Sequence, residues 1–403
     1  MKEPCLAKIM VLYASIGSGH KKAAEAIVES LVSGGERHDV CLIDVLSLMN
    51  PLYRNLVPRG YIWLARYFPP VLGFLYRFSD HSFSILPPAR FFRSLLSRLF
   101  SSGFKRFVRE FSPKMIVCTH FLPMELLSSD LISEGSPLLY VSITDIIPHA
   151  FWVAPGVERY FVAADESIKR MKDFGVPEEK ISVSGIPVHP SFKRARVACP
   201  AVAERAVPLK LLVVAGGAGV GPIEKLLEGL SGSHPSISVT VVAGSNRALF
   251  RRVFRKRFSY SFPVEVRRYT KRMSLLMEQA DLVLTKPGGL TTAECLAIGK
   301  PMILFSPIPG QEEDNLDILK AWGVAKSLSP AEKPPCFLED LLKNRQELFS
   351  MEERARERGR PDASRVVCQE ILLSFHETRS KDGGSSLSWK LYRAGRWAFS
   401  KWF

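Results

Sequence analysis

Short runs rich in Val, Ile and Leu recur along the 403-residue chain, and most are followed by a stretch whose apolar residues have helical spacing. Runs that are apolar on both faces are typical of strands buried in a parallel sheet. The first half predicts strands at "KIMVLY", "DVCLIDV", "KMIVCT", "PLLYVSI" and "RYFVA", and the second half at "KLLVVA", "SISVTVVAG", "VEVRRY", "DLVLT" and "PMILFS". This alternation predicts two similar α/β domains, each Rossmann-like and doubly wound, that face a central cleft.

The domain limits follow from changes in composition. We expect residues 1–190 to form the first domain and residues 209–376 the second. Residues 191–208 are rich in Pro, Arg and Ala and lack a periodic pattern, so they are interpreted as a linker. Residues 377–403 form a basic aromatic tail that ends in "LSWKLYRAGRWAFSKWF", which suits either an interfacial helix or a helix that docks on the protein itself.

Three glycine turns follow predicted strands. They contain Gly17 and Gly19, Gly216 to Gly221, and Gly288 and Gly289. In open parallel sheets, ligands bind at the carboxyl ends of the strands. We therefore expect all three turns to face the cleft.

The turn in "KPGGLTTAECLAIG" predicts a nucleotide site. Backbone amides at a helix start favour an anion such as a diphosphate, and Gly288 and Gly289 would let it approach the main chain. Thr291 and Thr292 could add hydroxyl donors, and Glu294 could accept hydrogen bonds from a ribose diol. The alternative is a helix start capped by threonine that carries a surface glutamate. No acidic residue ends the strand after Gly216–Gly221, which favours one nucleotide with a group attached over a nicotinamide dinucleotide.

Composition limits the cellular compartment and the kind of binding partner. The seven cysteines include no CxxC pair, which indicates a reducing compartment and argues against a zinc site. No apolar run reaches the length of a membrane span, and the apolar N-terminal stretch is better interpreted as a strand than as a signal peptide. The net charge of +15 predicts an anionic partner.

Much of the positive charge lies between residues 51 and 110, where ten Lys or Arg residues face two acidic ones and alternate with large aromatic residues. Basic amphipathic helices with aromatic side chains suit the surface of an anionic membrane. Nucleic acid is the competing partner, but no nucleic-acid motif is found. The remaining alternative is that the aromatic residues form core and the arginines a solvated face. We expect membrane contact and no nucleic acid.

Three segments carry a resemblance to a known family: "SIGSGHKKAAEAI", "VSITDIIPHAFWVAPGVERYFVAADESIKRMKDFGVPEEKISVSGIPVHPSF" and "KPGGLTTAECLAIGKPMILFSPIPGQEEDN". In this order they resemble the monogalactosyldiacylglycerol synthase and processive diacylglycerol glucosyltransferase family, which is similar to glycosyltransferase family 28. The resemblance implies a GT-B fold and a UDP-sugar donor. More distantly, the chain is similar to the GlcNAc transferase that completes the peptidoglycan lipid intermediate.

The resemblance also implies roles for the donor site. Gly288, Gly289, Leu290 and Thr291 would contact the diphosphate, and Glu294 would hold the ribose. The hexose would meet Gln311, Glu312 and Asn315, and Gly216 and Gly217 would approach the phosphates or the sugar. Asn246 and the stretch from Tyr269 to Met273 would lie near the uracil.

On the acceptor side, the resemblance makes His20 the candidate general base, because an imidazole can take a proton from an attacking alcohol near neutral pH. Asp145 would act as the base or orient the acceptor. His149 and Trp152 follow in the family pattern, and Gly17 and Gly19 shape the loop that precedes His20. His120 is a further cleft candidate, for which a capping role is favoured.

These implications give an expected function: transfer of glucose or galactose from UDP to diacylglycerol, with inversion and without a metal or other cofactor. The protein would be cytoplasmic and peripheral on the cytoplasmic membrane. The alternatives are a UDP-GlcNAc transferase for a polyprenyl-linked acceptor, a transferase for a soluble acceptor, a UDP-sugar epimerase, or a catalytically silent UDP-sugar sensor.

Overall fold

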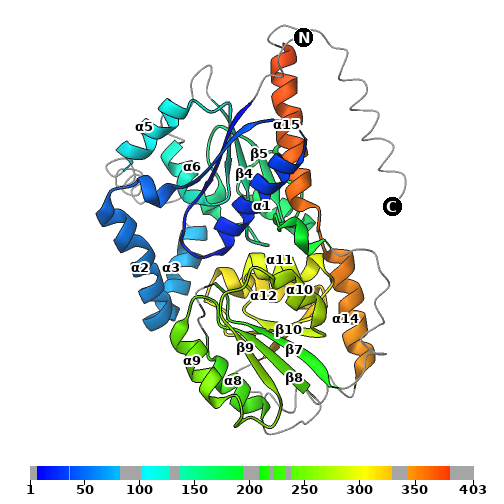
Figure 1. Ribbon diagram of the computed structural model, residues 1–403. Coiled ribbons are helices and arrows are strands. Elements are labelled where there is room, and N and C mark those ends of the chain that lie inside the picture. The colour runs from blue at the N-terminus through cyan, green and yellow to red at the C-terminus, as the bar shows by residue number, and fades with distance from the viewer. Residues whose placement is uncertain are drawn as a thin grey trace.

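The computed structural model describes residues 7–35, 37–81, 101–127, 137–193, 208–217, 219, 221–231, 237–328 and 344–381. Within these residues the chain forms two α/β domains, one built on each of two parallel sheets (Figure 1). The linker residues 194–207, residues 82–100 of the basic region and residues 382–403 of the tail lie outside the described residues.

The first sheet has the strand order β2-β1-β3-β4-β5-β6, and every neighbouring pair is parallel. Its strands are β1 (Lys8–Tyr13), β2 (Asp39–Asp44), β3 (Met115–Cys118), β4 (Leu138–Ser142), β5 (Val157–Val162) and β6 (Ile181–Val183). The strand order reverses between β1 and β3.

The second sheet has the order β12-β11-β10-β7-β8-β9 and is also parallel throughout. Its strands are β7 (Leu209–Val214), β8 (Ile237–Val242), β9 (Val264–Arg267), β10 (Leu282–Thr285), β11 (Met302–Phe305) and β12 (Ala325–Leu328). The order reverses between β7 and β10. Ligands of doubly wound sheets bind at such switch points.

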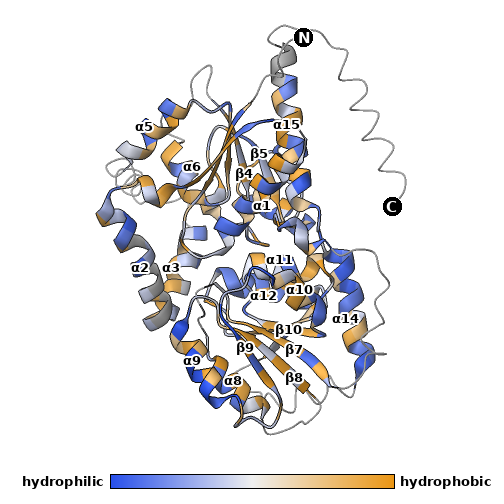
Figure 2. Cartoon of the chain, in the orientation of Figure 1, coloured by the Kyte–Doolittle hydropathy of each residue, from blue (hydrophilic) through white to orange (hydrophobic). Residues whose placement is uncertain are grey.

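All ten strands predicted from apolar runs are confirmed, and Figure 2 shows the apolar colour of the central strands. Most residues of the central strands are buried, whereas the edge strands β2 and β9 are mostly half-buried. The edge strands β6 and β12 were not predicted. Their side chains are mostly half-buried, so neither has the continuous apolar run that marks the central strands.

Helices cover both faces of each sheet. In the first domain they are α1 (Gly19–Ser33), α5 (Ser102–Phe111), α6 (Phe121–Leu127) and α7 (Asp165–Asp173). In the second they are α8 (Ile223–Leu230), α9 (Arg247–Lys256), α10 (Met273–Gln279), α11 (Gly289–Ala297), α12 (Gln311–Ala321) and α14 (Arg345–Arg358).

The basic region contains two longer helices, α2 (Pro51–Tyr67) and α3 (Pro69–His81). The prolines of this region do not all separate helices, because Pro58 lies inside α2. Proline removes one helical hydrogen bond. The carbonyl left without a donor belongs to Arg54, which is exposed, so water can replace the missing amide. Pro69 does begin a new helix.

The last described helix, α15 (Ala363–Lys381), returns to the first domain, although it begins within the range predicted for the second. Figure 1 shows α15 running beside α1. Val367, Ile371 and Phe375 are buried with β-strand residues of the first sheet, and the Cys368 thiol donates to the Ile27 carbonyl at 3.4 Å. The chain therefore passes from the first domain to the second before β7 and returns to the first with α15, so two connections join the domains.

Candidate active site

The three glycine turns meet at the interface between the domains, as the sequence predicts. A Cβ on Gly217 would overlap the Ser18 side chain, and one on Gly289 would overlap the Thr144 carbonyl oxygen. A Cβ on Gly19 would lie 3.5 Å from the Cβ of Leu290. Figure 1 shows the resulting arrangement, in which α1 of the first domain lies against α11 of the second.

This geometry adds a role that the sequence did not reveal. Gly289 was expected to let a ligand approach the main chain, but in this structure the backbone beside it packs on Thr144. Gly17 has a φ of +95°, and an added Cβ would meet no atom within 4 Å. Glycine is therefore favoured here by the left-handed backbone of the turn and not by a close contact.

His20 lies in the first turn of α1 and is half-buried between the domains. Its Nδ1 lies 2.9 Å from the Thr119 carbonyl oxygen and 2.8 Å from Thr144 Oγ1. Because a carbonyl can only accept, Nδ1 carries the proton and Nε2 keeps its lone pair. Burial lowers the pKa of His20 to about 4, so the imidazole is neutral at physiological pH. Nε2 has no hydrogen-bond partner within the described residues.

Two other aromatic rings fix the orientation of His20. The His120 ring meets it edge-on at 4.4 Å between centroids, and the Trp152 ring lies at 6.3 Å. His120 itself is buried, and its Nδ1 accepts from the Leu122 amide at 3.0 Å, which is the capping role favoured from the sequence. Thr119 and Thr144 were not singled out in the sequence, although Thr119 is the last residue of one predicted strand and Thr144 directly follows another.

Asp145 lies just beyond the end of β4 and is buried. One carboxylate oxygen accepts from Trp152 Nε1 at 2.8 Å, and the other accepts from the Gln311 side-chain amide of the second domain. Burial raises the pKa of Asp145 to about 7; the Trp152 hydrogen bond opposes this, and the nearby Asp314 adds to it. With both oxygens occupied, Asp145 is arranged here to join the domains and hold Trp152.

His149 is buried at the start of the short helix Ala150–Trp152. Its Nδ1 accepts from the Phe151 amide at 3.0 Å, and its Nε2 lies 3.1 Å from the Tyr76 carbonyl oxygen. The ring also lies 4.3 Å from the Tyr76 ring. Both nitrogens of His149 therefore contact protein groups, and the residue connects the strand end to α3.

The α11 turn presents the features predicted for a nucleotide. Gly288 precedes the helix, Thr291 is half-buried, and Leu290 is buried against the first domain. The Thr292 hydroxyl is used inside the helix, where it donates to the Gly288 and Gly289 carbonyls. Among the two threonines, only Thr291 therefore fits the predicted role of a phosphate donor.

Glu294 is buried in the next turn of α11, and burial raises its pKa to about 7 although the charge of Lys22 opposes the rise. Lys22 belongs to α1 of the first domain, and its Nζ also lies 5.7 Å from the centre of the Tyr269 ring. Tyr269 is 58% exposed, and Met273 is half-buried at the start of α10. Glu294 and Tyr269, predicted for the ribose and the uracil, thus both lie near Lys22, which the sequence analysis did not single out beside His20.

The Gly216–Gly221 turn is held by Asn246. The Asn246 side chain accepts from the Leu249 amide at 2.9 Å and donates to the Gly219 carbonyl at 2.8 Å. Gly216, with a φ of +72°, and Gly217 lie at the end of β7. In this structure the amide of Asn246 caps α9 and shapes the turn, and its polar atoms are already used.

Of the polar residues predicted to face the hexose, Asn315 and Gln311 contact the first domain, whereas Glu312 contacts its own domain. Asn315 is fully buried and bridges the domains, since its Oδ1 accepts from the Ile146 amide at 3.1 Å and its Nδ2 donates to the Pro287 carbonyl at 3.0 Å. Gln311 reaches Asp145. Glu312 accepts from the Ile308 amide at 2.7 Å, and its pKa is raised by burial while Lys286 opposes the rise.

Lys286 is a second cation that the sequence analysis did not assign. It follows β10 directly, near Glu312, and its Cε would lie 3.7 Å from a Cβ on Gly221. It therefore sits between the two glycine turns of the second domain, where a diphosphate is expected. Its place immediately before "PGG" is the signal that could have identified it.

The surface of α2 and α3 is unusually apolar. Nine large hydrophobic side chains on these helices and the residue between them are 45–66% exposed. They are Leu52, Leu56, Trp63, Tyr67, Phe68, Val71, Phe74, Leu75 and Phe78. This finding rules out the alternative that these particular side chains form core. Among the described residues, none of the helices is long and apolar enough to cross a bilayer.

Comparisons with known proteins agree with the sequence resemblance. Residues 20–188 match the family model described as monogalactosyldiacylglycerol (MGDG) synthase, and residues 211–365 match the glycosyltransferase family 28 C-terminal domain. The chain is 28% identical over 375 residues to a processive diacylglycerol beta-glucosyltransferase of Bacillus mycoides (strain KBAB4), covering 92% of this chain and 94% of the relative. It is 27% identical over 389 residues to the Bacillus subtilis (strain 168) protein of the same name, covering 94% and 99%.

Among solved structures, the chain is similar to MurG of Acinetobacter baumannii, with a TM-score of 0.59 and 15% identity over 91% of this chain and 99% of that one. Together with the two parallel sheets, this likeness confirms the GT-B fold. The family matches confirm the resemblance that the motifs indicated.

Proposed function

We propose, for a chain whose two halves match monogalactosyldiacylglycerol synthase and the glycosyltransferase family 28 C-terminal domain, that it transfers a hexose from a UDP-sugar to diacylglycerol. The product would be a β-glycosyl diacylglycerol, made at the cytoplasmic surface of the membrane. The name of the relatives supports glucose as the hexose, and the name of the N-terminal family model makes galactose the alternative to test.

The observation that carries this proposal is the position of His20 between the domains, with its Nδ1 proton donated to Thr119 and with no partner for Nε2 among the described residues. Nε2 would take the proton of the acceptor hydroxyl while the oxygen attacks the anomeric carbon and the bond to UDP breaks. The Thr119 carbonyl would stabilise the imidazolium that forms, because it already accepts the other N–H. A single displacement of this kind converts an α-linked donor into a β-glycoside.

On the donor side, the leaving UDP would meet the start of α11, where backbone amides and the helix dipole favour negative charge. Lys286 adds a positive charge at the same place. Glu294 would accept hydrogen bonds from the ribose, and its raised pKa shows how weakly it is solvated without them. We propose that these groups replace a metal ion in stabilising the diphosphate.

The substrates of this reaction occupy different phases, since the sugar nucleotide is in water and diacylglycerol is in the bilayer. The exposed apolar side chains of α2 and α3 belong to the domain that would bind the acceptor. Together with the positive charge that the sequence carries between residues 51 and 110, they suit an anionic membrane surface. This arrangement supports a peripheral enzyme that takes the lipid from the cytoplasmic leaflet.

The direct test is to incubate the purified protein with radiolabelled UDP-glucose or UDP-galactose and vesicles with or without diacylglycerol. We expect one donor to label a β-linked glycolipid only when diacylglycerol is present. Tight binding of UDP without any transfer would contradict the proposal. Labelling of a polyprenyl-linked acceptor in parallel assays would then favour the GlcNAc transferase reading, and no transfer at all would favour a sensor.

A further inference from the structure

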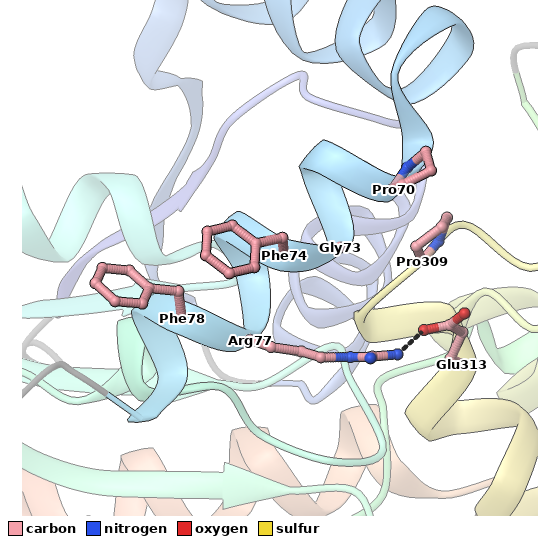
Figure 3. A pocket seen from close by; sticks show the side chains of 7 residues that line it. All are labelled: Pro70, Gly73, Phe74, Arg77, Phe78, Pro309 and Glu313. Carbon is pink, nitrogen blue, oxygen red and sulfur yellow. Dashed lines mark hydrogen bonds and ion pairs between the residues drawn. The ribbon is translucent and has the colours of Figure 1, made fainter.

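A groove of ≈ 530 Å³ lies at the surface where α3 of the first domain meets the segment before α12 in the second (Figure 3). Its lining is mainly apolar and includes a single ion pair. The lining residues are Pro70, Gly73, Phe74, Arg77, Phe78, Pro309 and Glu313.

The groove exists only because the two domains touch along α3. Pro309 packs against the backbone of Gly73, where a Cβ would lie 2.7 Å from the proline Cβ. Gly310 admits the Tyr76 ring in the same way. Arg77 closes the contact by donating to Glu313 at 2.7 Å, as the dashed line in Figure 3 shows. Both domains therefore contribute walls to the groove.

The apolar wall has no partner among the described residues that covers it. Phe74 is 66% exposed and Phe78 is 46% exposed, and their rings stack at 5.9 Å along one face of α3. The free energy falls when hydrocarbon replaces water around exposed aromatic side chains of this kind. Val71 and Leu75, the other exposed apolar side chains of α3, lie within one helical turn of Phe74, so a hydrocarbon chain from the bilayer could reach the wall along α3.

Residues next to the groove lining contact groups of the proposed reaction centre. Tyr76, next to Arg77, packs on His149, and Glu313 lies two residues after Gln311, which donates to Asp145. Trp152 then connects Asp145 to the ring of His20. An occupant of the groove would thus have its polar end near the groups that we propose for the reaction.

We propose that this groove holds one fatty acyl chain of the acceptor lipid, so that the bound acceptor touches both domains. The inference rests on the proposed function and names the part of the molecule that selects the acceptor. Hydrocarbon fits the observations because the groove is mainly apolar, lies on the face proposed for the membrane, and is lined by residues whose neighbours contact the proposed reaction centre.

The test compares two diacylglycerols, one with long and one with short acyl chains, in mixed micelles that keep the interface constant. For the Phe74→Ala/Phe78→Ala double variant we expect the preference in kcat/KM for the long-chain acceptor to fall roughly tenfold. A matched variant, Leu52→Ala/Leu56→Ala, removes two equally exposed residues of α2 outside the groove and should leave this ratio unchanged. All four residues are exposed, so folding should be preserved in both proteins.

A second measurement does not depend on catalysis. A fluorescent fatty acid should bind the wild-type full-length protein and be displaced by diacylglycerol, and the Phe74→Ala/Phe78→Ala variant should bind it much more weakly. An unchanged chain-length ratio in an active enzyme would overturn the acyl-chain proposal but not the proposed function. If diacylglycerol is not an acceptor, the binding assay alone tests the groove. Failure of the wild-type protein to bind the fluorescent fatty acid would then refute the groove as a lipid site. Loss of thermal stability in the double variant would, in that case, assign the groove to a segment of the chain itself.

Discussion

At the scale of single residues, His20 is the group on which the proposed chemistry depends. Replacing it with alanine should lower kcat roughly 10²- to 10⁴-fold, because that is the usual contribution of a positioned general base. UDP affinity should change little, since the groups proposed to bind UDP belong to the second domain. Steady-state kinetics and calorimetric titration with UDP would measure both quantities. The matched control is His189→Ala, because His189 is exposed and only caps the short helix Pro190–Phe192. Substantial turnover in His20→Ala would exclude it as the base.

Asp145 offers a prediction about stability and pH. Its pKa rises from 3.8 to about 7 on folding, so the folded protein binds a proton between these values that the unfolded chain has released. The free energy of unfolding therefore falls as the pH rises from about 4 to about 7, at up to about 1.4 kcal/mol per pH unit. Asp145→Asn should flatten this dependence. The asparagine can still accept from Trp152, and it can donate to Gln311 once that amide is turned.

Urea unfolding at pH 5 and pH 8 would measure the effect of Asp145→Asn. Glu294, whose pKa is also raised to about 7, contributes in the same direction, so the dependence should weaken in Asp145→Asn and weaken further in Asp145→Asn/Glu294→Gln. Burial also raises the pKa of Glu312 and of Asp314, so a smaller dependence should remain in the double variant. A pH dependence identical to that of the wild type in the double variant would show that neither carboxyl group is buried in the folded protein.

The sequence identified most site residues but not the contacts that several of them make. Glycine turns and a helix start are local features, and so Gly288, Glu294 and His20 could be located from their neighbours in the chain. Asn315 was expected to face the hexose, whereas here its amide joins Ile146 to Pro287. That contact depends on how the domains meet, which no local pattern contains. Lys22 was missed for the same reason, since its neighbours Glu294 and Tyr269 lie in the other domain.

At the scale of elements, the start of α11 must fit closely against the end of β4. An added Cβ at Gly289 would overlap the Thr144 carbonyl oxygen, which is backbone and cannot move aside alone. We expect Gly289→Ala to hold the domains apart and to reduce kcat strongly, with the increase in radius of gyration detected by small-angle X-ray scattering. Gly288→Ala is the matched control for the scattering measurement, because its Cβ would meet nothing closer than Glu312 Oε1 at 3.8 Å. Equal radii for the two variants would contradict this account of the interface.

The difference between buried and exposed positions explains which elements the sequence could predict. Central strands such as β3 and β11 are apolar throughout because both faces are buried, and they were located correctly. The edge strands β6 and β12 lack this pattern. The continuity of α2 through Pro58 also could not be predicted, since it depends on the exposure of one side of that helix to water.

At the scale of the whole molecule, charge and apolar surface make separable contributions to the proposed membrane binding. The chain has a net charge of +15, and each lysine or arginine near an anionic bilayer contributes about 1 kcal/mol. Binding to vesicles should therefore strengthen as the fraction of anionic lipid rises, and weaken as salt screens the charges. The part that survives high salt should come from the exposed side chains of α2 and α3.

This division can be measured by vesicle sedimentation at low and high salt. Trp63→Ser, which removes a 54% exposed indole from α2, should lower the salt-resistant part while leaving the slope against salt concentration unchanged. Val32→Ser is the matched control, because Val32 is 68% exposed on α1 and lies outside the proposed membrane face. Equal losses in the two variants would mean that α2 does not enter the bilayer, and the acceptor would then have to reach His20 by a route other than along α2 and α3.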